Sequence, residues 1–207
     1  MTKTKIAVLV SGGGTNLQAL IDAQHAGNIP SGEIVLVVSS QYGVRAIERA
    51  AAADIPCVVC NKKQLGGDQQ AFEQAICRAL DEAGAEMIIL AGFMSILSEA
   101  FTRRYSDRII NVHPSLIPSF CGKGMYGLKV HEAALAYGVK VTGATVHLVN
   151  EIPDGGRILL QKAVDILPGD TAEQLQRRVM EQAEWKLLPQ AAEMIAAALM
   201  NEKEESQ

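Results

Sequence analysis

The sequence has no long apolar run, no basic stretch and few cysteines. No segment reaches the roughly eighteen apolar residues that a membrane-spanning helix needs, and Met1 to Lys5 do not form part of a long apolar segment. The formal net charge of −4 and the pI of about 5.6 give no general attraction for nucleic acid or for an anionic membrane. We therefore expect a cytoplasmic protein that binds neither nucleic acid nor membranes. Any anionic ligand would be bound by groups in a local site.

The four cysteines do not predict a metal site or a disulfide framework. Cys57 and Cys60 have the two-residue spacing found in metal sites, but no second ligand pair follows them. Both lie in a short apolar segment typical of a strand, where residues three apart point to opposite faces. The sequence thus predicts diverging sulfurs and no metal.

Short apolar runs alternate with helical patterns through the first half of the chain. This alternation is typical of parallel strands joined by crossover helices. Leu17 and Ile21 share one face of the first expected helix, and Phe72 and Ile76 share one face of a later helix. The expected strands cover Ile6–Val10, Ile34–Val38, Cys57–Cys60, Met87–Leu90 and Arg108–Asn111.

The second half predicts a helix over Val130 to Tyr137 and two longer strands, Thr142 to Val149 and Arg157 to Val164, with antiparallel pairing as one option. Thr171 to Gln174 has the form of a capping box that opens a last helix. Its expected inward residues are Leu175, Val179 and Leu187.

No internal repeat, low-complexity tract or linker divides the chain. We expect one domain over residues 1–200 and a solvated tail over 201–207. The predicted fold class is α/β, a mostly parallel twisted sheet with flanking helices.

The most informative segment is 111–118, with the sequence NVHPSLIP. It follows a buried strand, and side chains two apart on a strand point the same way, so Asn111 and His113 are expected to face one pocket. Pro114 and Pro118 end the strand and stiffen its exit, because proline lacks a ladder donor. The Asn111 amide and the titratable His113 ring would then be held in fixed positions beside each other.

A glycine-rich segment, Ser11 to Asn16, follows the first strand and opens a helix. Backbone N–H groups and the positive end of that helix can meet one anion there. The fingerprint of a nicotinamide-dependent dehydrogenase is incomplete, because Leu17 replaces its third glycine and the second strand ends in Ser39 and Ser40 instead of an acid. A Walker loop is excluded too, since no lysine follows. The segment predicts a site for a single phosphate.

Three further motifs stand in fixed order around the central one: AGFM at 91–94, GKGMYG at 122–127 and DGG at 154–156. Together with the glycine segment and the chain length, they resemble the formyltransferases that use 10-formyltetrahydrofolate, and within them the phosphoribosylglycinamide formyltransferase family of purine synthesis. The similarity extends from about Lys5 to Pro189. It implies a Rossmann-like formyltransferase fold and an enzyme whose co-substrate is 10-formyltetrahydrofolate, with no metal.

The resemblance also implies catalytic roles. The amine of phosphoribosylglycinamide would attack the formyl carbon, while Asn111 and protonated His113 stabilise the oxyanion and Asp154 orients His113 and favours its charged form. Taken singly, a histidine before proline is often structural, and Asp-Gly-Gly is often only a turn. His147 faces the site or is structural, and the sequence does not decide between these.

Two binding ends follow from the same resemblance. The folate end is expected to be apolar and to lie after the fourth strand, where open α/β sheets bind ligands. The ribotide end is expected at the glycine segment and near the last helix. The predicted ribotide residues are Gly14, Thr15, Asn16 and Glu184, and the predicted folate residues are Met94, Ser95, Ile96, Leu97 and Asn111.

The sequence departs from the family pattern at a few positions. Gln69 stands where many relatives have arginine, which leaves an ionic contact with folate open, and Trp185 and Leu188 replace a histidine and a tyrosine beside Glu184. The segment Ser119 to Leu128 has three glycines and little periodicity. It predicts a mobile cover over the site, with an ordinary surface connection as the alternative.

Other functions remain open at this point. Another folate-dependent formyltransferase or a formyltetrahydrofolate deformylase would share the central motif, although each usually carries an added domain that this sequence does not show. A silent nucleotide-binding domain would keep the glycine segment without needing Asn111, His113 and Asp154 together. The sequence leaves open whether the protein is a monomer or a homodimer.

Overall fold

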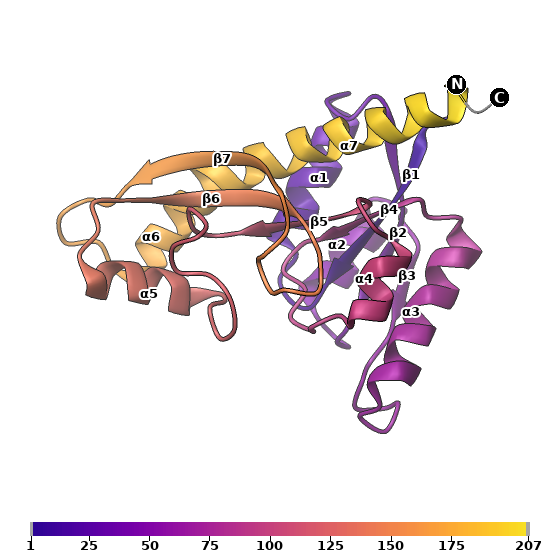
Figure 1. Cartoon of the computed structure of the whole chain (residues 1–207), viewed down its shortest axis with the longest axis horizontal. Coiled ribbons are helices and arrows are strands. Elements are labelled where there is room, and N and C mark those ends of the chain that lie inside the picture. The colour runs from indigo at the N-terminus through magenta and orange to yellow at the C-terminus, as the bar shows by residue number, and fades with distance from the viewer. Residues whose placement is uncertain (1, 206–207) are drawn as a thin grey trace.

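The computed structural model describes residues 2–205, and its centre is a twisted sheet with helices on both faces (Figure 1). The strands are β1 (Thr4–Val10), β2 (Gly32–Ser39), β3 (Cys57–Val59), β4 (Met87–Leu90), β5 (Ile109–His113), β6 (Val141–Leu148) and β7 (Ile158–Asp165). They lie in the order β3-β2-β1-β4-β5-β6-β7. The pairings from β3 to β5 are parallel, whereas β6 and β7 are antiparallel to their neighbours.

Helices cover the two faces of this sheet unequally. They are α1 (Thr15–His25), α2 (Arg45–Ala52), α3 (Gln69–Ala83), α4 (Glu99–Arg104), α5 (Leu128–Tyr137), α6 (Ala172–Val179) and α7 (Trp185–Glu205), with a π-helical turn, η1 (Met180–Glu184), before α7. One core cluster joins the sheet to α1, α2, α6 and α7, and the other joins it to α3 and α4. The sheet is therefore buried on both faces, which accounts for its continuous apolar strands.

The predicted α/β fold with its mostly parallel sheet is confirmed. Each expected strand is present with ends that differ by a few residues, and the last two strands take the antiparallel option. Cys57 packs against the core cluster of α1 and α7, whereas Cys60 belongs to the cluster of α3. The two side chains thus belong to different core clusters, although Cys60 lies just beyond the end of β3.

The predicted last helix begins as expected but is not continuous. Thr171 and Gln174 form the capping box, and Leu175 and Val179 are fully buried. The π-helical turn then inserts extra backbone before α7. In an unbroken α-helix, Glu184 would lie about half a turn away from Leu175 and would face outward. The turn brings Glu184 inward, and such turns are frequent at functional sites.

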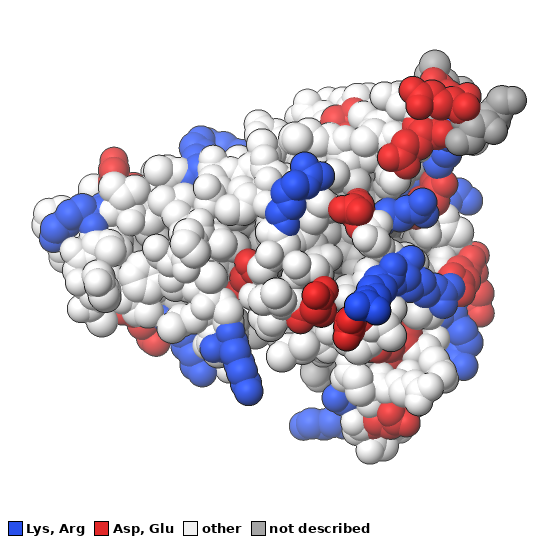
Figure 2. All heavy atoms as spheres, in the orientation of Figure 1, with Lys and Arg blue, Asp and Glu red and all other residues white. Residues whose placement is uncertain are grey.

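Helix α7 continues to Glu205, so residues 201–205 of the predicted tail are helical and mostly exposed. Residues 206 and 207 of that tail lie outside the described residues. Within residues 2–205, no helix combines the length and the apolar character needed to cross a membrane. Acidic and basic side chains interleave on the face shown in Figure 2, and no continuous band of one sign crosses that face.

Candidate active site

Strand β5 carries Asn111 and His113 on one face at its carboxyl end. Ile110 and Val112 point into the core cluster of α1 and α7, so the intervening residues point the other way. In the pairing with β6, Asn111 lies opposite His147 and His113 lies opposite Thr145. Asn111 and His113 line one cavity of about 230 Å³, as the two-residue spacing predicted.

Asp154 reaches the same place from the loop between β6 and β7. Its backbone is left-handed, with φ of 56°, a conformation that is uncommon outside glycine. Two residues later only glycine fits, because a Cβ on Gly156 would lie 1.7 Å from the carbonyl oxygen of Leu148. The tight turn around Gly156 therefore directs the Asp154 carboxylate back toward β5.

The buried His113 ring has an acceptor beside each nitrogen. Its Nε2 lies 2.9 Å from the carbonyl oxygen of Phe120, and its Nδ1 lies 3.5 Å from Oδ2 of Asp154. A carbonyl and a carboxylate can only accept, so a ring that carries a proton on both nitrogens satisfies both neighbours. The ring is therefore held between two acceptors.

Asp154 is the negative partner in this cluster. Burial alone would raise the pKa of its carboxyl group, but nearby donors, among them the Gly122 N–H, outweigh burial and hold that pKa below its ordinary value. The Gly122 N–H donates to Oδ2 at 2.8 Å, and Nε2 of His147 lies 3.7 Å from Oδ1. Asp154 is therefore a fixed anion between two histidines.

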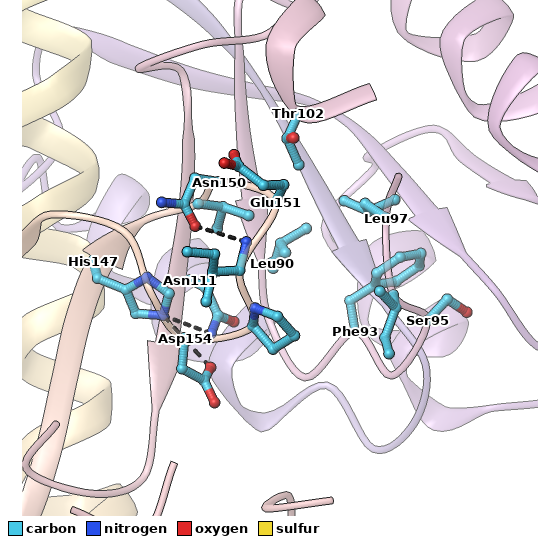
Figure 3. Close-up of a pocket in the computed structure, with 14 residues that line it drawn as sticks. Leu90, Phe93, Ser95, Leu97, Thr102, Asn111, His147, Asn150, Glu151 and Asp154 are labelled. Carbon is cyan, nitrogen blue, oxygen red and sulfur yellow. Dashed lines mark hydrogen bonds and ion pairs between the residues drawn. The ribbon is translucent and has the colours of Figure 1, made fainter. Parts of the chain in front are cut away.

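A second cavity, of about 140 Å³, opens on the other side of Asn111 and Asp154. In Figure 3, the side chains of His147, Asn111 and Asp154 point toward one another, and Phe93 and Leu97 stand on the opposite wall. Asn111, Asp154 and Phe93 line both cavities. The two cavities thus meet at an amide and a carboxylate, with His147 on one side and His113 on the other.

The glycine segment forms the start of α1. Gly14 has φ of 70°, and a Cβ there would lie 2.8 Å from Cβ of Ala46, so both conformation and space require glycine. No side chain caps this helix, which leaves N–H groups of its first turn for an anion. Nε of Arg49 donates to the carbonyl oxygen of Gly13 at 2.9 Å. Arg49 was not predicted, because it lies on α2 and no local pattern connects it with Gly13.

Asn16 and Glu184 meet in the larger cavity, where Nδ2 of Asn16 donates to Oε2 of Glu184 at 2.7 Å. Burial raises the pKa of Glu184 to about 7, and the hydrogen bond from Asn16 offsets this only in part. Oδ1 of Asn16 is buried and has no partner within the described residues. The pair offers hydrogen-bonding groups to a polar ligand.

The other predicted ribotide residues lie outside this pair. Thr15 contacts Sδ of Met180 at 3.8 Å and lines a hollow on the outer side of α1, and Gly14 turns the backbone into the helix. Only Asn16 and Glu184 of the predicted set line the larger cavity.

Three of the four predicted folate residues after β4, together with Asn111, line the smaller cavity: they are Ser95, Ile96 and Leu97. Met94 instead lines the larger cavity, because the segment is an irregular turn in which the Met94 N–H donates to Oγ of Ser11 at 2.9 Å. Gln69 touches the rim, where its amide donates to the Ile96 carbonyl oxygen at 3.0 Å. Within residues 2–205, no group of three or more His, Cys, Asp or Glu residues is arranged to hold a metal ion.

The segment Ser119 to Leu128 contacts the reaction centre through its backbone, by the Phe120 carbonyl and the Gly122 N–H. Met125 and Tyr126 line the larger cavity. The segment therefore lies over the site, and its mobility stays a prediction.

Sequence reasoning missed Thr145, which anchors the residues after β5. Its hydroxyl donates to the Ser115 carbonyl oxygen at 2.6 Å and accepts from the Ile117 N–H at 3.1 Å. The Gln161 amide also donates to this hydroxyl, at 3.0 Å. The one available signal was the alternation that places Thr145 on the same face of β6 as His147.

Comparison with known proteins shows the family of the chain. The family model described as formyl transferase matches residues 4–192. The chain belongs to the formyl transferase family. The phosphoribosylglycinamide formyltransferase of Haemophilus influenzae is 41% identical over 185 residues, which cover 89% of this chain and 84% of that protein. The resemblance predicted from the motifs is thus confirmed.

Solved structures of formyl transferase family members share the fold. A phosphoribosylglycinamide formyltransferase from Brucella melitensis superposes with a TM-score of 0.86 at 42% identity, covering 95% of this chain and 97% of that one. The trifunctional purine biosynthetic protein adenosine-3 of Gallus gallus is 45% identical over 94% of this chain, but the match covers only 19% of that protein. The chain therefore spans about a fifth of the length of such multifunctional relatives.

Proposed function

We propose that the chain transfers the formyl group of 10-formyltetrahydrofolate to the amine of 5'-phosphoribosylglycinamide, giving formyl-phosphoribosylglycinamide and tetrahydrofolate, a step of purine biosynthesis. The observation that carries this proposal is the junction of two cavities at Asn111 and Asp154. Direct transfer between two bound molecules requires such a junction. The names of relatives that match nearly the whole chain support the choice of substrates.

The larger cavity is the proposed ribotide side. The uncapped start of α1, braced by Arg49, would receive the phosphate through backbone N–H groups. Asn16 and Glu184 would hydrogen-bond the polar part of the ribotide. The amine would then reach the junction beside His113.

The smaller cavity is the proposed folate side. Its walls combine Leu90, Phe93 and Leu97 with polar groups at the junction, a composition that suits a flat, partly polar ring. The formyl group would reach Asn111 from this side. Because Gln69 is neutral, it would contact folate by hydrogen bonding and not by charge.

In the proposed reaction, the amine forms a bond to the formyl carbon while the carbonyl electrons move to oxygen. Charged His113 and the Asn111 amide donate hydrogen bonds to that oxyanion. When the intermediate collapses, the bond to the folate nitrogen breaks, and the proton lost by the amine passes to that nitrogen, with Asp154 holding a relaying water. Asp154 and the Phe120 carbonyl face the two nitrogens of His113 and would orient its ring toward the oxyanion.

The test is formyl transfer from 10-formyltetrahydrofolate in the presence of phosphoribosylglycinamide, followed by absorbance, with the ribotide omitted as the control. Ribotide-dependent turnover is expected. Folate consumption without the ribotide would instead indicate a deformylase, and no consumption would indicate a different acceptor or a silent binding domain. A monomeric or homodimeric state and a cytoplasmic location stay predictions.

A further inference from the structure

His147 is a buried histidine whose role the proposed reaction does not use. It lies on β6 opposite Asn111 and is 2% exposed. Its Nδ1 lies 2.8 Å from the carbonyl oxygen of Leu148, and its Nε2 lies 3.1 Å from Nδ2 of Asn111. Figure 3 shows its ring directed at the Asn111 amide and the Asp154 carboxylate.

The contacts of His147 determine which of its nitrogens carries the proton. A carbonyl oxygen only accepts, so Nδ1 must donate to Leu148. In a neutral ring, Nε2 is then an acceptor, and the Asn111 NH₂ group is the donor in front of it. The Asp154 oxygen at 3.7 Å lies beyond ordinary hydrogen-bonding distance. The contacts are those of the tautomer that carries its proton on Nδ1.

This arrangement contrasts with a charged ring. If Nε2 also carried a proton, it could only donate, and its nearest acceptor would be the Asp154 carboxylate. The Asn111 NH₂ group would then have no acceptor on His147. The other ionisable groups around this point are Glu151, which lines the same cavity, and His113 on β5. The tautomer with its proton on Nδ1 satisfies both near contacts of His147.

The Asn111 amide has two chemically different ends, and only its NH₂ end can stabilise an oxyanion. We propose that His147 is a positioning residue that keeps the Asn111 NH₂ group turned toward the junction of the two cavities. One N–H donates to Nε2 of His147, and the other stays available to the formyl oxygen. Without this acceptor, the amide can turn and present its carbonyl oxygen, which repels the developing charge. The effect on catalysis rests on the proposed function, whereas the state of the ring does not.

Two substitutions separate positioning from packing. In His147→Asn, the amide can still donate to Leu148 but does not reach Asn111, whereas His147→Gln can place a carbonyl oxygen near the former Nε2. We expect His147→Asn to lower kcat about tenfold, the size of one ordinary hydrogen bond, with KM for both substrates little changed. His147→Gln should recover most of that loss. Equal losses in two folded variants would overturn the proposal.

A double-mutant cycle with Asn111→Ala sharpens the test. If His147 acts through Asn111, then adding His147→Asn to the Asn111→Ala protein should change kcat less than twofold, because the amide is already absent. An undiminished tenfold effect in that background would show that His147 acts by another route.

The ring itself can be examined without substrate. Two-bond ¹H–¹⁵N spectra of ¹⁵N-histidine-labelled protein at mildly alkaline pH should show His147 protonated on Nδ1 and not on Nε2, with His147→Gln used to assign the signals. Protonation on Nε2 would overturn the proposal. A wild-type protein without formyl transfer would overturn the proposed function instead, so the two failures are distinguishable.

Discussion

The residues of the reaction centre come from a regular strand and from irregular loops, and these two kinds of backbone have different roles. Asn111 and His113 stand on β5, where ladder bonds to β4 and β6 fix the direction of each side chain. Phe120 and Asp154 stand on loops, both with positive φ. The strand supplies the groups that would meet the formyl oxygen, and the loops supply the acceptors that face the two nitrogens of His113. Changes on the strand should therefore remove chemistry, and changes on the loops should weaken it.

The largest effect is expected on the strand. His113→Ala should lower turnover by at least the roughly 10²-fold typical of a lost acid or oxyanion donor. Steady-state kcat measures this, with His25→Ala as the control because His25 lies at the end of α1, away from both cavities. A folded His113→Ala protein with near-normal turnover would contradict the assigned role.

A smaller effect is expected on the loop. Asp154→Asn keeps the shape and tolerates the left-handed backbone, but it removes the charge beside His113. We expect kcat to fall about tenfold to a hundredfold, because the charged ring loses its partner while Asn111 and His113 remain. The unfolding midpoint in urea should change little. A loss as complete as that of His113→Ala would mean that Asp154 is itself indispensable to the chemistry.

A third substitution displaces the loop between β6 and β7 without changing Asp154 itself. In Gly156→Ala, the added Cβ would overlap the Leu148 carbonyl oxygen, so the turn must shift and carry Asp154 with it. We expect about tenfold lower kcat and a loss of about 1–3 kcal/mol in the free energy of unfolding. Gly13→Ala is the stability control, because a Cβ there meets nothing within 4 Å. Equal stability of the two variants would contradict the close approach at Gly156.

The same division explains what the sequence could predict. Asn111 and His113 were placed correctly because a strand has a fixed period of two, and the apolar runs located the strands themselves. Met94 lies in an irregular turn, where no period exists, and the structure places it in the other cavity.

Contacts between distant segments escaped prediction for a related reason. Arg49 on α2 braces Gly13, and Thr145 on β6 holds the residues after β5. Neither contact leaves a local pattern in the sequence, because each depends on which strands and helices become neighbours. The π-helical turn before α7 is likewise invisible, although it decides that Glu184 faces inward.

The contrast between regular and irregular backbone also affects stability. The π-helical turn buries Glu184, which a regular helix would expose. The pKa of Glu184 is about 7 in the folded protein against 4.5 for an ordinary glutamate. Between these values the unfolded chain releases the proton while the folded chain keeps it. This contribution to stability is fully present below pH 4.5 and is lost as the pH rises through 7, by on the order of 3 kcal/mol.

Glu184→Gln isolates this contribution, since glutamine cannot titrate and its carbonyl can still accept from Asn16. Urea unfolding of both proteins at several pH values from about 4.5 to 7.5 should show the variant gaining stability relative to the parent as the pH rises. The ribotide KM of the variant should rise only a few-fold, because the hydrogen-bonding shape remains. A stability difference that stays constant across this range would mean that Glu184 is already ionised in the folded protein, and would contradict the raised pKa.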